Sequence, residues 1–417
     1  MSAPSAIEEV RSRKIFDSRG SEAIEIDIVT ERTLGRSSAP SGASKGRWEV
    51  KSYPDGGVDR ALEAVQRLIV PRLVGMKVDS LKPIDSVLHE IDPTRDLSTI
   101  GGNTAYAISV ASAIAGASSK GVPLFQYLSE RENSELPYPL GNVIGGGLHA
   151  KGERTDIQEF LVLPTSSRTF AEAAAANIKV HKEVARLIEN RGLKLSGRGD
   201  EGAWVAPLES EQALEILSKA CDEVSSQTGV KLRTGIDMAT STLWNEKNNA
   251  YIYRRDDKRL DDGEQLEFVL ELIKEYKLAY VEDPFDEESF DSFAELTSKA
   301  HDTLICGDDL FTTNIERLDR GIRAKAANAV IIKPNQVGTL SDAIAAANIA
   351  KKAGYVPVVS HRSGETCGPE ISHLAVALQA PIIKLGVVGG ERTAKINELI
   401  RIEESLGEKA KMANIRA

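Results

Sequence analysis

The chain has 417 residues, 41% of them hydrophobic and 27% charged, and its formal net charge is −10 at pH 7. Because a single hydrophobic core seldom grows beyond about 250–300 residues, this length predicts two domains. The acidic balance argues against broad binding to nucleic acid or anionic lipid. The three cysteines show no Cys-x-x-Cys spacing, and no apolar run approaches the ~20 residues of a membrane span. We therefore expect a cytoplasmic protein without disulfides, export signal or membrane span.

The first part of the chain mixes strand and helix patterns. Polar and apolar residues alternate over residues 22–29, which predicts a half-buried strand, whereas residues 59–73 and the small-residue run 103–120 predict helices. This mixture indicates an α+β domain. The polar, proline-punctuated residues 133–139 are typical of a connection between compact units, so we expect domains of residues 1–135 and 136–417.

Six short apolar runs in the second domain each stop at a polar residue. In chain order these residues are Asp237, Glu282, Asp308, Lys333, His361 and Lys384. From Glu282 onward they are 26, 25, 28 and 23 residues apart, which is about the length of one strand, one helix and two short loops. The pattern predicts an α/β fold in which a parallel β/α (TIM-like) barrel gathers these side chains on one rim.

The acids and cations on this rim indicate a metal-assisted reaction on an anionic substrate. Asp237, Glu282 and Asp308 would repel one another unless a cation lay among them, and an all-oxygen ligand set favours Mg²⁺. Lys333 follows the next strand, where a nearby dication would favour the neutral amine that a general base requires. Residues 361–363 (His-Arg-Ser) offer donors suited to phosphate oxygens.

Blocks spread over almost the whole chain resemble the enolase family, and the sequences of several blocks resemble those of archaeal members. They occur in the family's order: residues 16–20 (FDSRG), 40–44 (PSGAS), 199–202 (GDEG), 281–285 (VEDPF), 307–310 (GDDL), 332–339 (IKPNQVGT), 360–365 (SHRSGE) and 399–407 (LIRIEESLG). The resemblance implies a smaller α+β capping domain before a barrel that opens ββαα, with its second strand antiparallel. It also implies a reversible, Mg²⁺-dependent dehydration of 2-phosphoglycerate to phosphoenolpyruvate, as in glycolysis and gluconeogenesis.

The roles of individual residues follow from the resemblance. Lys333 corresponds to the general base at C2, and Glu201 to the general acid for the C3 hydroxyl. The first of two magnesium ions would be held by Asp237, Glu282 and Asp308, and Ser41 would help to bring in the second with the substrate. The implied substrate-binding set is His149, Gln158, Glu159, Glu282, Asp308, His361, Arg362, Ser363 and Lys384. Within that set, Lys384 corresponds to the lysine on the substrate carboxylate, and Arg362 with Ser363 to the phosphate clamp.

Mobile loops and assembly are further expectations. The glycine-rich residues 37–46 and 145–152 are interpreted as lids that close over substrate. The family resemblance implies a homodimer or larger homo-oligomer, in which Glu25 matches an acid that pairs with an arginine matched by Arg401.

The chain departs from the family pattern in three places. Lys45 replaces a threonine, Leu148 precedes His149, and residues 386–392 are shortened. Loop closure and local packing are therefore expected to differ in detail.

Two alternatives are compatible with the fold. A sister enzyme, such as an acid-sugar dehydratase or a racemase, would act on an unphosphorylated carboxylate and would not need the clamp of His361, Arg362 and Ser363. A catalytically silent binding protein derived from an enolase would be free to lose its metal ligands, acid and base, and all of these positions are filled here by the required residue type.

Overall fold

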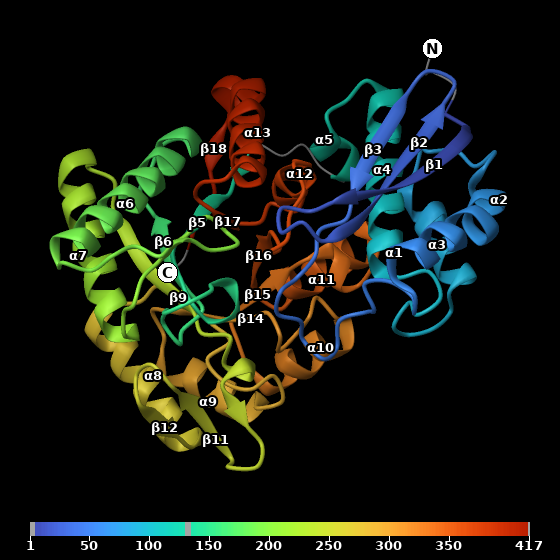
Figure 1. Ribbon diagram of the computed structural model, residues 1–417. Helices are drawn as coiled ribbons and strands as arrows, with labels where there is room; N and C mark the ends of the chain where they lie inside the picture. Colours follow the sequence, from blue (N-terminus) through green and yellow to red (C-terminus); the bar gives the residue numbers. More distant parts are fainter. Residues whose placement is uncertain (1–4, 130–134, 416–417) are drawn as a thin grey trace.

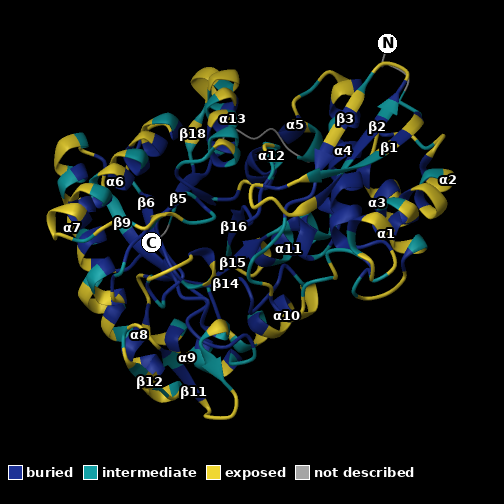
Figure 2. Cartoon of the chain, in the orientation of Figure 1, coloured by how far each residue is buried: buried dark blue, intermediate teal, exposed yellow. Residues whose placement is uncertain are grey.

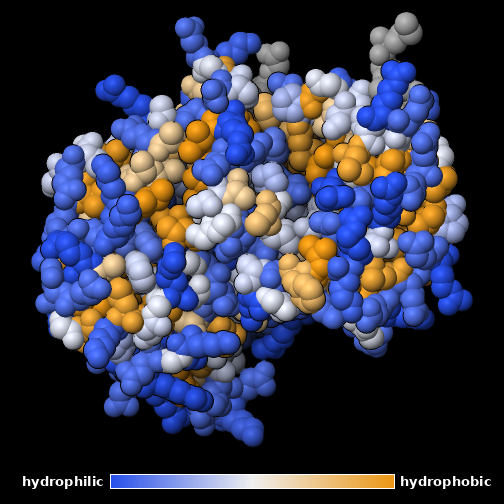
Figure 3. Space-filling view, turned by 45° about the horizontal axis from the view of Figure 1, so that its top comes forward, coloured by the Kyte–Doolittle hydropathy of each residue, from blue (hydrophilic) through white to orange (hydrophobic). Residues whose placement is uncertain are grey.

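The computed structural model describes residues 5–129 and 135–415, which form a smaller lobe of sheet and helices beside a larger barrel (Figure 1). Within these residues no helix is long and apolar enough to cross a membrane. The face shown in Figure 3 is mostly hydrophilic, with hydrophobic residues in small groups.

The smaller lobe is built on an antiparallel sheet of β1 (Ile7–Phe16), β2 (Glu22–Thr30) and β3 (Leu34–Ser38). Strand β2 confirms the strand predicted from alternation. The long helix α4 (Gly102–Lys120) packs against this sheet and is buried along most of its length. A Cβ on Gly35 would lie only 1.9 Å from the carbonyl oxygen of Ala111. The run of small residues therefore allows the helix and the sheet to approach closely.

The helix predicted over residues 59–73 is interrupted. It consists of α1 (Gly57–Ala64), a π-helical turn (Val65–Ile69) and α2 (Val70–Leu73). Pro71 has no backbone N–H to donate to the preceding turn, which accounts for the change of hydrogen-bond pattern before it. The remaining helices of this lobe are α3 (Leu81–Ile91) and α5 (Leu124–Leu128).

The larger lobe is a closed barrel, as predicted, and it has eight strands in the described part of the chain. Its strands are β5 (Tyr138–Gly145), β6 (Glu159–Pro164), β9 (Leu232–Asp237), β13 (Tyr280–Glu282), β14 (Leu304–Gly307), β15 (Ala329–Ile332), β16 (Val356–Ser360) and β17 (Ile382–Gly386). Strand β6 is antiparallel to both of its neighbours, whereas the other pairings, including the closing pair β17–β5, are parallel. Two helices follow β6 before the next barrel strand, so the ββαα opening implied by the family resemblance is confirmed.

Helices cover the outside of the barrel. They are α6 (Phe170–Asn190), α7 (Ser210–Thr228), α8 (Asp262–Tyr276), α9 (Phe290–Lys299), α10 (Ile315–Ala324), α11 (Leu340–Lys352), α12 (Glu370–Ala377) and α13 (Gly390–Leu406). Short strands lie at the periphery: β7 (Gly197–Arg198), β8 (Trp204–Val205), β10 (Trp244–Asn245), β11 (Ala250–Tyr253) and β12 (Lys258–Leu260). Figure 2 shows the barrel strands largely buried and the exposed residues on the outer faces of the helices. A cluster that includes Leu140, Leu161 and Ile331 forms one of the two hydrophobic clusters of the chain's described part.

The two lobes are joined by side chains that cap a barrel helix. The hydroxyl of Ser109 accepts from the backbone N–H of Leu340 at 3.0 Å, and Asp85 accepts from that of Ser341 at 3.1 Å. The first N–H groups of α11 are thus satisfied from the smaller lobe.

The predicted boundary between the domains falls beside an additional strand pair. Residues 130–134, which include the start of the predicted connection, lie outside the described residues. Strand β4 (Glu135–Leu136) straddles the predicted boundary and pairs in parallel with β18 (Lys411–Met412). The division at residues 135/136 therefore remains our proposal.

Candidate active site

The polar residues predicted at the strand ends meet at one rim of the barrel. Asp237 and Glu282 are the last residues of β9 and β13, while Asp308 and Lys333 directly follow β14 and β15. Lys384 differs from the prediction, because it lies within β17 and not after its end. Hydrogen bonding to β5 extends β17 to Gly386, although the apolar run stops before Lys384.

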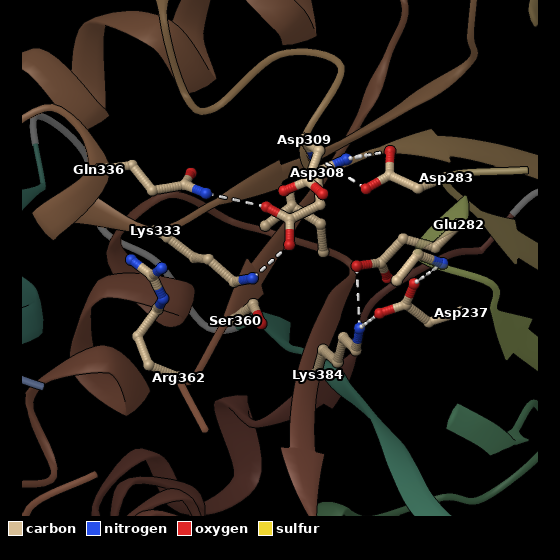
Figure 4. Close-up of polar contacts among 12 residues, drawn as sticks. Asp237, Glu282, Asp283, Asp308, Asp309, Lys333, Gln336, Ser360, Arg362 and Lys384 are labelled. Carbon is tan, nitrogen blue, oxygen red and sulfur yellow. Dashed lines mark hydrogen bonds and ion pairs between the residues drawn. The ribbon is translucent and has the colours of Figure 1, made fainter. Parts of the chain in front are cut away.

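Two lysines hold the acids of this rim: Lys384, which is buried, and Lys333, whose side chain is 12% exposed (Figure 4). Lys384 Nζ lies 2.8 Å from Asp237 Oδ2 and 2.8 Å from Glu282 Oε1. Lys333 donates to Asp308, and Gln336 Nε2 donates to the other oxygen of Asp308 at 2.9 Å. The lysines therefore divide the acids into two groups, each paired with its own ammonium.

Burial and proximity shift the pKa values of these groups. Burial and the adjacent Asp237 raise the pKa of Glu282 well above its ordinary value. Burial alone would lower the pKa of Lys384, but the charges of Asp237 and Glu159 raise it. Asp308 likewise outweighs burial and raises the pKa of Lys333. Both lysines are therefore ammonium ions in this arrangement.

The donor set suits a hard cation. Burial of like-charged carboxylates is costly, and the raised pKa of Glu282 reflects that cost, which a dication would relieve. The predicted ligands do not form a single tight cluster. Among the described residues, ligand atoms come within 4.8 Å of one another in two other groups: His149, Glu159 and Glu201, and Asp283, Asp308 and Asp309.

One wall of the site is a network of two carboxylates and two histidines, in which Glu159 lies 3.3 Å from Lys384. His149 Nδ1 lies 3.2 Å from Glu159 and 3.6 Å from Glu201, and His361 Nε2 lies 3.2 Å from Glu201. Burial alone would raise the pKa of Glu201, but His361 and His149 hold this pKa well below its ordinary value. Burial is outweighed at His149 too, where Glu201 and Glu159 raise the pKa of the imidazole.

Arg392, which sequence reasoning did not assign to the site, orients this wall and the predicted clamp. Its fully buried guanidinium donates to Nδ1 of His361 at 2.6 Å and to the carbonyl oxygens of Arg362 and Ser363, each at 2.6 Å. Burial lowers the pKa of His361 to about 4. The neutral ring accepts at Nδ1 and therefore carries its proton on Nε2, facing Glu201.

One cavity brings most of the predicted site together. Its lining residues are Gly42, Ser44, His149, Gln158, Glu159, Glu201, Asp237, Asp308, Lys333, Ser360, His361, Arg362, Ser363 and Lys384. Two predicted residues are not among them. Glu282 lies behind Lys384 and is fully buried, and the hydroxyl of Ser41 donates to Asp17 at 2.5 Å. Ser44 lines the cavity instead, and sequence reasoning missed it although it belongs to the same short block as Ser41.

The loop between β3 and α1 reaches from the smaller lobe into this site. Ser41 forms an antiparallel bridge with Gly364, and the backbone N–H of Ala43 donates to the hydroxyl of Ser363 at 2.5 Å. Further along, Arg47 pairs with Glu287 at 2.7 Å. Residues 39–50 therefore cover the barrel rim.

The three departures from the family pattern have defined positions. Lys45 is exposed and donates to Ser52 at 2.8 Å, and Leu148 is 50% exposed on the second predicted lid. In the shortened segment, a Cβ on Gly386 would lie 2.1 Å from the carbonyl oxygen of Glu201. This glycine therefore lets the end of β17 pack directly against the segment that carries Glu201.

A capping lobe on a closed barrel, with acids and lysines on the rim, defines a β/α-barrel enzyme for an anionic substrate. Comparison with known proteins agrees with this class. The model of the family described as "Enolase, N-terminal domain" matches residues 7–128, and that described as "Enolase, C-terminal TIM barrel domain" matches residues 133–417. The chain belongs to the enolase family.

Similar archaeal proteins cover nearly the whole chain. The enolase of Methanosphaera stadtmanae is 52% identical over 404 residues, which are 96% of this chain and 98% of the relative. The enolase of Methanothermobacter thermautotrophicus is 50% identical over 96% of this chain and 97% of its own length. The enolase of Archaeoglobus fulgidus is 47% identical over 98% of this chain and 100% of its own length.

Proposed function

We propose that this chain is a phosphopyruvate hydratase, a lyase that interconverts 2-phosphoglycerate and phosphoenolpyruvate. The observation that carries the proposal is the single cavity lined by Lys333, Glu201, Lys384 and Arg362. It offers a base, an acid and cations for both the carboxylate and the phosphate of one small substrate. An unphosphorylated substrate would leave the buried Arg362 without its proposed ligand.

Lys333 is proposed as the base that takes the proton from C2. As an ammonium paired with Asp308 it cannot do so, and it must first lose that proton. Neutralisation of Asp308 by a cation would remove the partner that raises the pKa of Lys333. Lys384 is proposed to orient the substrate carboxylate, and Gln158 and Ser363 to contact the substrate at the cavity wall.

Glu201 is proposed as the acid that gives a proton to the departing C3 hydroxyl. Its own lowered pKa makes it a poor proton store, whereas His149 lies between Glu201 and Glu159 and has a raised pKa. We infer that the proton reaches Glu201 from His149. In the reverse reaction, the ionised Glu201 would take a proton from water.

Two magnesium ions are proposed as cofactors. Asp237, Glu282 and Asp308 would hold the first, and Ser44 is better placed than Ser41 to assist the second, since Ser41 is hydrogen-bonded to Asp17. When bound, the ions would stabilise the negative charge that develops on the substrate carboxylate. A homodimer or larger homo-oligomer in the cytoplasm completes the proposal.

The test is the growth of phosphoenolpyruvate absorbance when purified protein meets 2-phosphoglycerate and Mg²⁺. We expect product that disappears with EDTA and in Lys333→Ala. A folded, magnesium-loaded protein that forms no product would contradict the proposal and favour one of the two alternatives, a sister substrate or a binding role.

A further inference from the structure

The guanidinium of Arg362 is occupied by a carboxylate from the smaller lobe. Both oxygens of Glu49 accept from Nη2 of Arg362, at 2.9 and 3.0 Å. The side chains of Arg362 and Glu49 are only 4% and 6% exposed. A buried, doubly contacted ion pair of this kind is strong because little water competes for either partner.

The loop that carries Glu49 encloses the same nitrogen from a second side. A Cβ on Gly42 would lie 2.2 Å from Nη2 of Arg362, so the loop backbone packs closely against the guanidinium. The other terminal nitrogen of Arg362 donates to Asn335 at 2.9 Å. Three of the five N–H donors of this guanidinium therefore have partners, and a phosphate that is to bind Nη2 has to replace Glu49.

Glu49 is also connected to the acids of the barrel rim. Gln336 Nε2 donates to Glu49 at 3.3 Å and to Asp308 at 2.9 Å. Thr313 donates to the amide oxygen of Gln336 at 2.7 Å, which orients its NH₂ group toward both acids. Glu49 therefore lies close to Asp308, a candidate metal ligand. An anionic group of the substrate that entered beside these two carboxylates would be repelled by the charge of Glu49.

We propose that Glu49 is a positioning residue that acts through Arg362: it holds the guanidinium until the substrate's phosphate displaces it from Nη2. This inference rests on the proposed function, in which Arg362 binds the phosphate. The dianionic phosphate is the stronger acceptor and repels the Glu49 carboxylate, so the two anions compete. Displacement would remove one of the contacts that hold the loop that carries Ser44, so phosphate recognition would influence the position of Ser44.

The decisive measurement is calorimetric titration of Glu49→Gln with inorganic phosphate. Because a neutral amide competes poorly for a guanidinium, we expect phosphate to bind about tenfold more tightly than to the wild type. In an Arg362→Ala background, adding Glu49→Gln should not increase the affinity for phosphate. With 2-phosphoglycerate, KM should fall in Glu49→Gln without a rise in kcat.

Glu246→Gln is the matched control. Glu246 is 77% exposed and lies 3.7 Å from Arg47 of the same loop, so this change removes a nearby negative charge without touching Arg362. Its phosphate affinity should equal that of the wild type. If Glu49→Gln does not fold, Glu49→Asp, which shortens the contact's side chain, should show a smaller gain in affinity.

Unchanged or weaker phosphate binding in a folded Glu49 variant would overturn the inference and make Glu49 a support for Arg362. The titration does not depend on turnover. A chain without lyase activity but with the expected affinity gain would contradict the proposed function alone, whereas an active chain without the gain would contradict the competition alone.

Discussion

At the residue scale, the proposed acid and base lie on different elements and can be separated experimentally. In Glu201→Gln, elimination should slow by about 10²–10⁴-fold, while Lys333 still exchanges the C2 proton with solvent. The measurement is loss of the C2 proton signal of 2-phosphoglycerate in D₂O by NMR, beside phosphoenolpyruvate formation. Lys333→Ala should lose both activities. Retained elimination in Glu201→Gln would assign the acid to another group.

Asp27 provides a pH-dependent contribution to stability away from the active site. Asp27 is fully buried and accepts hydrogen bonds from Arg13 and Arg36. Burial alone would raise the pKa of its carboxyl group, but Arg36 and Arg13 hold that pKa below the ordinary value. Its stabilising effect is therefore complete above the unfolded-state pKa of about 4 and is lost as the pH falls below that value. Since both arginines are partly exposed, we expect Asp27→Asn to cost about 2 kcal/mol at pH 7.

Urea unfolding between pH 3 and pH 7 measures this contribution. The difference in free energy of unfolding between wild type and Asp27→Asn should be constant at neutral pH and shrink below about pH 4. Asp59→Asn, at a carboxylate 74% exposed, serves as the control and should show no such trend. A difference that does not vary with pH would mean that Asp27 acts through packing alone.

At the element scale, the loop over the rim is anchored by an exposed tryptophan. Trp48 Nε1 donates to Glu288 at 2.7 Å, and the guanidinium of Arg317 lies 4.9 Å from the ring centroid. Trp48→Ala should therefore speed hydrogen exchange over residues 39–50 and raise KM for 2-phosphoglycerate about three- to tenfold, a loss of roughly 1 kcal/mol. Mass spectrometry of exchange measures the effect.

The exposed Leu34, outside the loop, provides the control for this experiment. Leu34→Ala should leave hydrogen exchange over residues 39–50 unchanged. In the wild type, saturating substrate with Mg²⁺ should slow hydrogen exchange in the two predicted lids, residues 37–46 and 145–152. If Trp48→Ala exchanged like the wild type, the anchoring role would be wrong.

Sequence patterns predicted the barrel better than the details of its site. Apolar runs identified the barrel strands that carry the acids because those strands are buried on both faces. They misplaced Lys384, since its strand continues by hydrogen bonding beyond the apolar run. Pattern could not choose between Ser41 and Ser44, which differ only in where the folded loop directs them. Arg392 was missed because its contacts with residues 361–363 are formed only in the folded chain.

At the scale of the whole molecule, assembly is the main open prediction. Within one chain, Glu25 bonds to Arg13 and Arg401 bonds to Glu398, while the side chain of Arg401 is 64% exposed. If Arg401 joins subunits, Arg401→Glu should convert a dimer or larger species into monomers in light-scattering chromatography. Glu398→Gln removes the partner of Arg401 within the chain, together with a 3.0 Å contact to His373, and should keep the native mass. An unchanged mass for Arg401→Glu would exclude this arginine from the interface.

The closing seam of the barrel bears on how the chain folds during synthesis. Strand β5 pairs with β17, and β4 pairs with β18 close to the end of the described chain. The barrel therefore cannot be sealed until nearly all of it has left the ribosome, whereas the smaller lobe is complete by residue 128. Because domains generally fold in the order in which they emerge, the smaller lobe is ready while the barrel strands are still unpaired. Its Asp85 and Ser109 then present acceptors to α11 as soon as that helix emerges.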